Sequence, residues 1–168
     1  MKKTLIPFLA LAMLAACNND KKETTTTGES TEKNAGLTVN DEEGKTGTFT
    51  ADGTNFKGKS STQYFGNKTT GQYSVLCQQD DPFALLQAIF ANEKNASGSL
   101  KPSTSFTSIE PGTVNIALSG TAIGAKEFVT KSSSAGSITV EGKKLILKDV
   151  ELFNQDDQKK TVSAEINF

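Results

Sequence analysis

The stretch VSAEINF, residues 162–168, alternates apolar and polar side chains without interruption. Its apolar residues share one side of an extended chain, because successive side chains of a β-strand point to opposite faces. An amphipathic helix would instead repeat its apolar positions every three or four residues. The pattern therefore predicts a strand with one buried face, and it sets the interpretation of the rest of the chain.

Similar segments lie upstream and are separated by Gly, Asn and Asp residues. Phe49 and Ala51 alternate with threonines before Asp52-Gly53, a dipeptide favoured in two-residue hairpins, and Phe56 follows on the expected return strand. Other segments with a period of two are residues 72–78, 114–118 and 138–140. We expect these segments to pair as antiparallel strands.

Residues 143–153 also predict a strand, but a less regular one. Leu145, Ile146 and Leu147 are contiguous, and Val150 follows three positions after Leu147, so the inward face switches partway along the segment. A β-bulge or a bend near Lys148 would produce this switch.

Residues 83–92 leave two interpretations open. Asp81 and Pro82 suit the start of a short helix, and the sequence that follows is rich in Ala and Leu. Phe83, Leu85 and Ile89 also fit a strand that is buried on both faces, and neighbours that are all β favour this second interpretation.

Residues 45–168 are expected to form a single all-β domain. An antiparallel β-sandwich is the leading architecture, with a small lipocalin-like barrel that holds an apolar ligand as the alternative. The ten Phe residues of the chain could fill a sandwich or line a barrel cavity.

The N-terminal segment has the features of a lipoprotein signal peptide. Two lysines precede an apolar stretch, residues 4–14, which is far shorter than the ~20 residues of a membrane span. The residues LAAC, 14–17, match a lipobox. We therefore expect residues 1–16 to be removed and Cys17 to carry acyl chains that hold the protein on a membrane.

Residues 17–44 are predicted to be the lipidated cysteine and a disordered tether, because almost no apolar residue is present to support folding. With this lipobox, tether and β domain, the chain resembles the small lipoproteins of Bacteroidota. The resemblance implies a place in the bacterial envelope. Asn18, in place of the Asp that favours inner-membrane retention, implies the outer membrane, and the charged residues 20–23 imply display on the surface.

Missing residue types exclude several functions. The chain contains no His, no Trp and no Arg, so it lacks the commonest general base and the commonest metal ligand. A net charge of -1 and the absence of Arg argue against nucleic-acid binding. We expect a protein that is not an enzyme and has no cofactor; a hydrolase that uses carboxylates alone is the enzymatic alternative.

Two acidic doublets, Asp80-Asp81 and Asp156-Asp157, are weak candidates for a calcium site. Calcium takes six to eight converging oxygens, and Asp pairs are common in turns, so no metal site is predicted. Cys77 is interpreted as a small buried hydrophobe without a catalytic role.

These observations predict an envelope lipoprotein that is anchored to the membrane by its acyl chains. The β domain is expected to have a binding or structural role, with lipocalin-like binding of an apolar small ligand as the alternative. Cys17 is the one residue to which the sequence assigns a function, lipid attachment. The sequence does not identify the ligand or the protein partner.

Overall fold

A computed structural model describes residues 38–40 and 44–168, which belong to a compact unit spanning Asn34–Phe168. Cys17 and the lipobox lie outside the described residues. The strands are β1 Thr38–Asn40, β2 Thr46–Ala51, β3 Thr54–Phe65, β4 Gln72–Gln79, β5 Ala84–Phe90, β6 Gly98–Pro102, β7 Thr113–Ser119, β8 Phe128–Val129, β9 Ser137–Glu141, β10 Lys144–Phe153 and β11 Lys159–Asn167. Two 3₁₀ turns, η1 Glu93–Asn95 and η2 Thr121–Ile123, complete the described elements.

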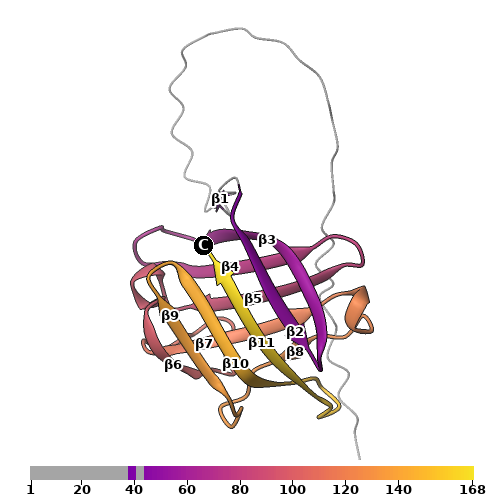
Figure 1. The fold of residues 1–168 in the computed structure, drawn as a ribbon. Helices are drawn as coiled ribbons and strands as arrows, with labels where there is room; N and C mark the ends of the chain where they lie inside the picture. The colour runs from indigo at the N-terminus through magenta and orange to yellow at the C-terminus, as the bar shows by residue number, and fades with distance from the viewer. Residues whose placement is uncertain (1–37, 41–43) are drawn as a thin grey trace, which may run out of the picture. The chain divides into compact units, whose positions relative to one another are not determined.

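Nine of these strands form a closed β-barrel. Their order is β3, β2, β11, β10, β9, β6, β7, β5 and β4, and β4 pairs back to β3. Neighbours are antiparallel except for β6 and β7, which are parallel. In Figure 1, β2, β11 and β10 pass in front of β4, β5 and β7 and cross them steeply.

The all-β prediction is confirmed, and the closed sheet agrees better with the barrel alternative than with a sandwich. Closure depends on β3, which pairs with β2 as far as Lys59 and with β4 from Lys59 to Phe65. Because β3 pairs with β2 on one side and β4 on the other, it joins two walls that a sandwich would keep as separate sheets. Residues 38–40, within the predicted tether, form β1 and pair with β3, so the folded unit begins before residue 45.

The predicted hairpin and the predicted bulge are both present. Asp52 and Gly53 have φ values of 48° and 81°, as a tight turn between β2 and β3 requires. In β10, the register with β11 shifts between Leu147 and Val150, and Asp149 has a φ of 52°. The bulge lies where the inward face of the sequence switches.

Residues 84–90 form β5, so the helix interpretation of residues 83–92 is wrong and the strand interpretation is confirmed. β5 pairs with β4 on one side and β7 on the other. Leu86, Ala88 and Phe90 face the core, and Ile89 is also buried, at 7% exposure. A position between two buried strands therefore overrides the local helix propensity of Ala and Leu.

Side chains fill the inside of the barrel. The largest ones below 2% exposure are Tyr73, Phe49, Phe90, Leu86, Ile116, Leu118, Leu145, Leu147, Leu152, Ile166, Val75 and Val114. Phe49 and Phe56 stack with their ring centroids 4.9 Å apart. The core is thus packed in the way a small barrel requires.

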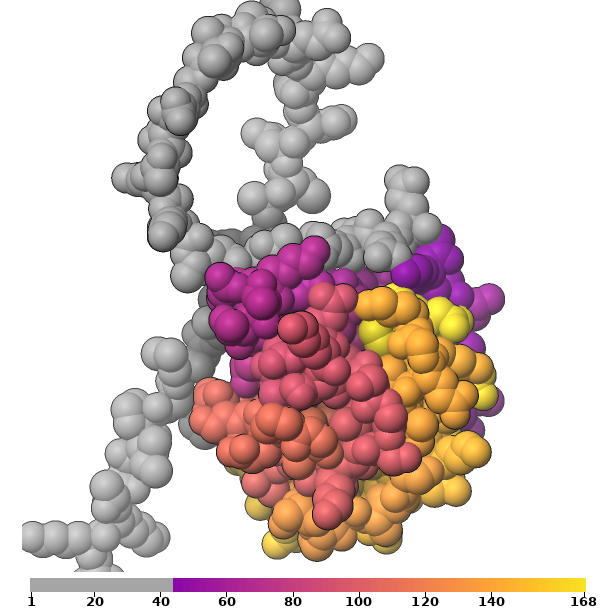
Figure 2. Space-filling model, turned by 90° about the vertical axis from the view of Figure 1, so that its left-hand side faces the viewer, coloured from indigo at the N-terminus to yellow at the C-terminus, as the bar shows by residue number. Residues whose placement is uncertain are grey.

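The wall between β7 and β10 is the least regular part of the barrel. β6 pairs with β9 over three residues and with β7 over two. The short β8 pairs with β7 on one side and with β10 on the other. Figure 2 shows the red segment that includes β6 lying against the orange segment that includes β9. No helix within residues 38–40 and 44–168 is long and apolar enough to cross a membrane.

Candidate functional site

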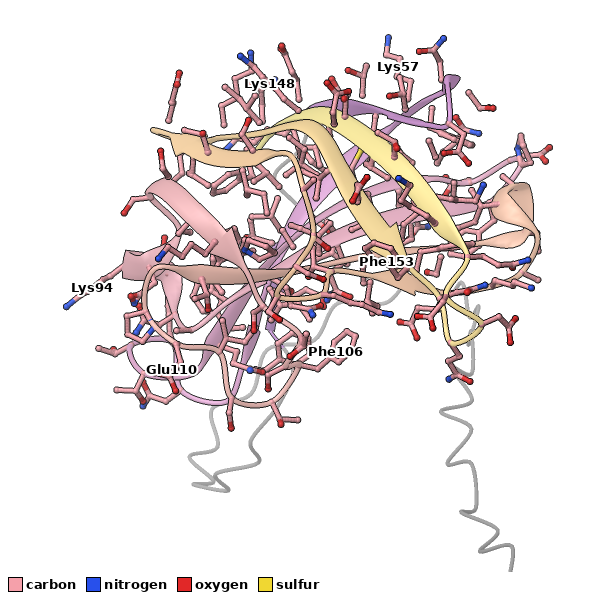
Figure 3. The ribbon with its side chains drawn as sticks, turned by 90° about the horizontal axis from the view of Figure 1, so that it is seen from below. Lys57, Lys94, Phe106, Glu110, Lys148 and Phe153 are labelled. Carbon is pink, nitrogen blue, oxygen red and sulfur yellow. The ribbon has the colours of Figure 1, made fainter. Side chains whose placement is uncertain are left out.

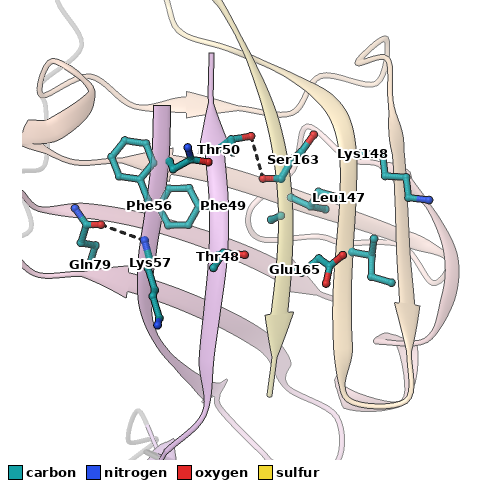
Figure 4. A pocket seen from close by; sticks show the side chains of 13 residues that line it. Thr48, Phe49, Thr50, Phe56, Lys57, Gln79, Leu147, Lys148, Ser163 and Glu165 are labelled. Carbon is teal, nitrogen blue, oxygen red and sulfur yellow. Dashed lines mark hydrogen bonds between the residues drawn. The ribbon is translucent and has the colours of Figure 1, made fainter. Parts of the chain in front are cut away.

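A groove of about 720 Å³ lies across the outer wall formed by β3, β2, β11 and β10 (Figure 4). Its polar lining comes from side chains that point away from the core, while Phe49 and Phe56 contribute from beneath. The lining residues are Thr48, Phe49, Thr50, Asn55, Phe56, Lys57, Gln79, Ile146, Leu147, Lys148, Ser163, Ala164 and Glu165.

Strand register arranges the polar lining in two rows. In one row, Thr48 lies between Lys57 of β3 and Glu165 of β11. In the other row, Thr50 lies between Asn55 and Ser163. Directly opposed residues of antiparallel strands have neighbouring side chains, so hydroxyl, amide and charged groups lie side by side across three strands.

Hydrogen bonds hold parts of this surface in place. The Thr50 hydroxyl donates to the Ser163 carbonyl at 3.5 Å, and the Lys57 backbone N–H donates to Gln79 Oε1 at 3.1 Å. The Ser163 hydroxyl donates to Asp149 Oδ1 at 3.1 Å, which connects the groove to the β10 bulge. The geometry suits recognition of a polar ligand by hydrogen bonds.

Lysines give the groove its charge. Lys57 extends from β3 and Lys148 from β10, on opposite sides of the groove in Figure 4. Glu165 pairs with Lys144 at 2.6 Å; the hydrogen bond from Lys144 lowers the pKa of the carboxyl, with help from the charges of Lys144 and Lys148. The groove lining thus has two lysines, Lys57 and Lys148, against the single carboxylate of Glu165, which is also paired with Lys144, and this charge suits an anionic ligand.

A second polar cluster caps one end of the barrel. The Tyr64 hydroxyl donates to Glu93 Oε2 at 2.7 Å, and Lys143 Nζ donates to Glu93 Oε1 at 3.0 Å. Lys143 Nζ also lies 5.5 Å from the centroid of the Phe168 ring and 5.9 Å from that of Tyr73. These contacts stabilise the aromatic end of the core.

The acidic doublets are turn residues that make local contacts. Asp80 Oδ1 accepts a hydrogen bond from Gln78 Nε2 at 2.8 Å, Asp156 pairs with Lys126 at 3.2 Å, and Asp157 pairs with Lys131. Hydrogen bonding to Lys131 lowers the pKa of Asp157. In the part of the chain that the structure describes, no group of three or more His, Cys, Asp or Glu side chains is placed to hold a metal ion.

Cys77 lies in the core with an exposed fraction of 0%, as the sequence predicts. Burial raises the pKa of its thiol to about 11, against the smaller lowering effect of the Gly58 and Gly47 backbone. Cys17, the predicted lipid-attachment residue, lies outside the described residues.

The sequence does not predict the groove, because the residues that line it are far apart along the chain. Alternation places Thr48, Thr50, Ser163 and Glu165 on outward faces, but it does not show that β2 and β11 are neighbours. The Glu93 cluster has no local signal either, since its members come from β3, η1 and the turn before β10.

No protein-family model matches this chain, and searches of curated proteins and of solved structures find no significant match. The groove and the end cluster are therefore interpreted from their own geometry.

Proposed function

We propose that this protein is a lipid-anchored, non-catalytic binding protein of the bacterial envelope, whose barrel binds a polar, anionic small ligand in the outer groove. The observation that carries the proposal is the groove of about 720 Å³, in which Lys57 and Lys148 lie beside hydroxyl and amide side chains and among apolar lining residues. This volume lies within the range of about 300–1,000 Å³ that is usual for small-ligand sites.

The chemistry of the lining supports binding more than catalysis. Thr48, Thr50 and Ser163 have no neighbouring imidazole to activate a hydroxyl, since the sequence contains no His. Lys57 and Lys148 can each donate charge-assisted hydrogen bonds to a carboxylate or phosphate. A ligand that carries acidic groups beside hydroxyl groups, such as an acidic saccharide, would satisfy both features.

Attachment to the membrane is supported by the LAAC lipobox at residues 14–17. Acylation of Cys17 would confine the barrel to a membrane surface, where a ligand-binding domain meets its ligand at the cell envelope. Intact mass and membrane fractionation of the natively expressed protein test this part, with surface protease treatment of whole cells to locate the barrel.

A lipocalin-like function is the second candidate, and the closed barrel favours it. An apolar ligand would have to displace side chains, because Leu86, Ile116 and Leu145 have exposed fractions of 0%. The aromatic end of the core, where the Tyr64 and Tyr73 ring centroids are 5.0 Å apart, is the part that such a ligand would have to open.

Titration followed by ¹H–¹⁵N correlation spectra separates the two candidates. Trigalacturonate should shift the amide signals of Thr48, Thr50 and Ser163, whereas maltotriose, its neutral counterpart, should have little effect. Palmitate should leave the core signals unchanged; shifts at Leu86 and Ile116 with palmitate alone would instead support the lipocalin-like function.

Replacement of Lys57 and Lys148 by Gln should raise the trigalacturonate Kd about tenfold, the effect of losing roughly 1.4 kcal/mol of charge-assisted hydrogen bonding. The double replacement of Lys126 and Lys131 by Gln is the matched control, because these lysines pair with Asp156 and Asp157 and do not line the groove. An equal loss in the control and the groove variant would show that only the net charge matters.

A further inference from the structure

Two exposed aromatic side chains lie at one corner of the barrel. Phe65 and Phe106, each 39% exposed, are the large apolar side chains that stand out from the surface within residues 44–168. Phe65, at the end of β3, lies opposite Gln72 of β4, and Gln72 Nε2 donates to the Phe106 carbonyl at 2.8 Å. The two rings therefore belong to one surface, the aromatic corner, although 41 positions separate them in the sequence.

Buried hydrogen bonds hold the loop that presents Phe106. At the start of loop 103–112, the Ser103 N–H donates to the Val114 carbonyl at 2.8 Å. The Ser103 carbonyl accepts from Asn115 Nδ2 at 3.0 Å and from the Thr130 hydroxyl at 2.7 Å, and both of these donors have exposed fractions of 0%. Phe106 is thus presented to solvent by a loop whose start is held by buried hydrogen bonds.

Thr38, the first residue that the structure describes, lies beside this corner. Thr38 of β1 lies opposite Tyr64 in the β1–β3 register, next to Phe65. Twenty residues, 18–37, separate Thr38 from Cys17. A coil of that length has a root-mean-square span of about 25 Å, and even full extension reaches only about 70 Å.

We propose that the aromatic corner, Phe65 and Phe106, contacts the bilayer that holds the acyl chains of Cys17. This inference rests on the lipid anchor of the proposed function. A short tether gives the barrel an effective concentration at the membrane in the millimolar range, so two partly exposed rings suffice for a populated contact. The aromatic side chains would lie at the level of the lipid headgroups, as Phe and other amphipathic or apolar groups do in peripheral proteins.

Charge plays a small part in this contact. Lys68 lies in the loop after Phe65, with its Nζ 5.3 Å from the Tyr64 ring centroid, and Glu110 is exposed on the loop that carries Phe106. Because these charges have opposite signs, the contact depends on apolar burial and should form on zwitterionic lipid.

The proposed contact also orients the ligand groove. Figure 3 shows Lys57 and Lys148 on one side of the barrel and Phe106 on the opposite side. With the aromatic corner against the bilayer, the groove faces away from the membrane, where a soluble ligand has access to it.

Single tryptophans test the contact, because the natural sequence contains none. Phe65→Trp and Phe106→Trp are made in the acylated protein, which is reconstituted into phosphatidylcholine vesicles with or without bromine on the lipid tails. We expect brominated lipid to quench both tryptophans and not the control Lys57→Trp, which lies in the groove on the opposite wall. Adding Phe106→Ser to Phe65→Trp should weaken the quenching at position 65.

Different results would contradict the proposed lipid anchor and the proposed membrane contact. Acylated protein that floats with the vesicles while all three tryptophans are quenched equally, or not at all, would overturn the aromatic corner and leave the anchor intact. Protein that carries no acyl mass and does not float would remove the anchor and the contact together. The Phe65 and Phe106 variants report independently, so a folding defect in one does not decide the outcome.

Discussion

The fold buries the Cys77 thiol and so protects it from reagents in solution. Its pKa of about 11, raised by burial, means that only about one molecule in a thousand carries a thiolate at pH 8. We expect Ellman's reagent to leave the native acylated protein unreacted over hours and to react with Cys77 at once in urea. Rapid reaction of the native acylated protein would contradict the buried position.

Substitution of Cys77 measures the energy of its packing. Cys77→Ser should lower the free energy of unfolding by about 1–3 kcal/mol, because a hydroxyl in this apolar site is poorly satisfied. The exposed fraction of 0% supports the full effect. Urea denaturation of the two proteins gives the difference, and a value near zero would mean that the serine finds a good partner in the Gly47 or Gly58 backbone.

Glu93 connects the stability of the barrel end to pH. The hydrogen bonds from Tyr64 and Lys143 lower the pKa of its carboxyl, more than burial raises it. A carboxyl with a lowered folded-state pKa stabilises the protein above its unfolded pKa of about 4.3, and this contribution is lost as the pH falls through the folded value.

Glu93→Gln should therefore be less stable than the natural protein at pH 7, by no more than about 1 kcal/mol because the pair is partly exposed to solvent. Below pH 4 the difference between the two proteins should shrink. Thermal unfolding at pH 7, 5 and 3 tests this; a difference that stays constant across the three pH values would exclude the carboxylate as its cause.

Among the strands and turns, local sequence predicts the features that are set by residues close together in the chain. The Asp52-Gly53 hairpin and the β10 bulge follow from turn chemistry and from the switch of the apolar face at residues 145–150. The strand at 84–90 needed tertiary context, because its pairing with β4 on one edge and β7 on the other is not visible in the local sequence. Prediction of the groove would need still more tertiary information, since the groove depends on the pairing of β2 with β11.

Two glycines of the β2–β3 hairpin are required for different reasons, one for its backbone conformation and the other for close packing. Gly53 has a φ of 81° and open space where a β-carbon would lie, so Gly53→Ala should cost about 1 kcal/mol through backbone strain alone. At Gly58, a Cβ would lie 2.2 Å from the Gln78 carbonyl oxygen, so Gly58→Ala should disrupt the β3–β4 pairing that closes the barrel.

Circular dichroism and urea unfolding of the two alanine variants test this difference. Gly53→Ala serves as the matched control for the loss of a glycine in the same hairpin. Equal stability of the two variants would show that β3 and β4 can separate at Gly58 without penalty, contrary to the packed backbone described there.

The whole molecule presents two different surfaces on one closed barrel. The polar groove lies on the wall of β3, β2, β11 and β10, and Phe106 of the aromatic corner lies on the side opposite Lys57 and Lys148 (Figure 3). The sequence predicts the anchor from a short motif and the β domain from alternation, but barrel closure depends on pairings such as β3–β4 and β6–β7. Which outward residues lie on the groove wall and which lie at the aromatic corner follows only from that closure.

The two cysteines allow anchoring and folding to be separated in one experiment. Cys17→Ala should remove the acyl mass and leave residues 1–16 uncleaved, because the lipobox peptidase acts after acylation, while the melting temperature of the barrel stays within about 1 °C. Cys77→Ala should be acylated and cleaved normally but melt several degrees lower, since a core side chain is shortened. Intact mass and thermal unfolding of both variants give the two readouts. A Cys17→Ala chain that is cleaved after Ala16 without acylation would instead identify an ordinary secretory signal, and the barrel would then meet its ligand without a membrane to orient it.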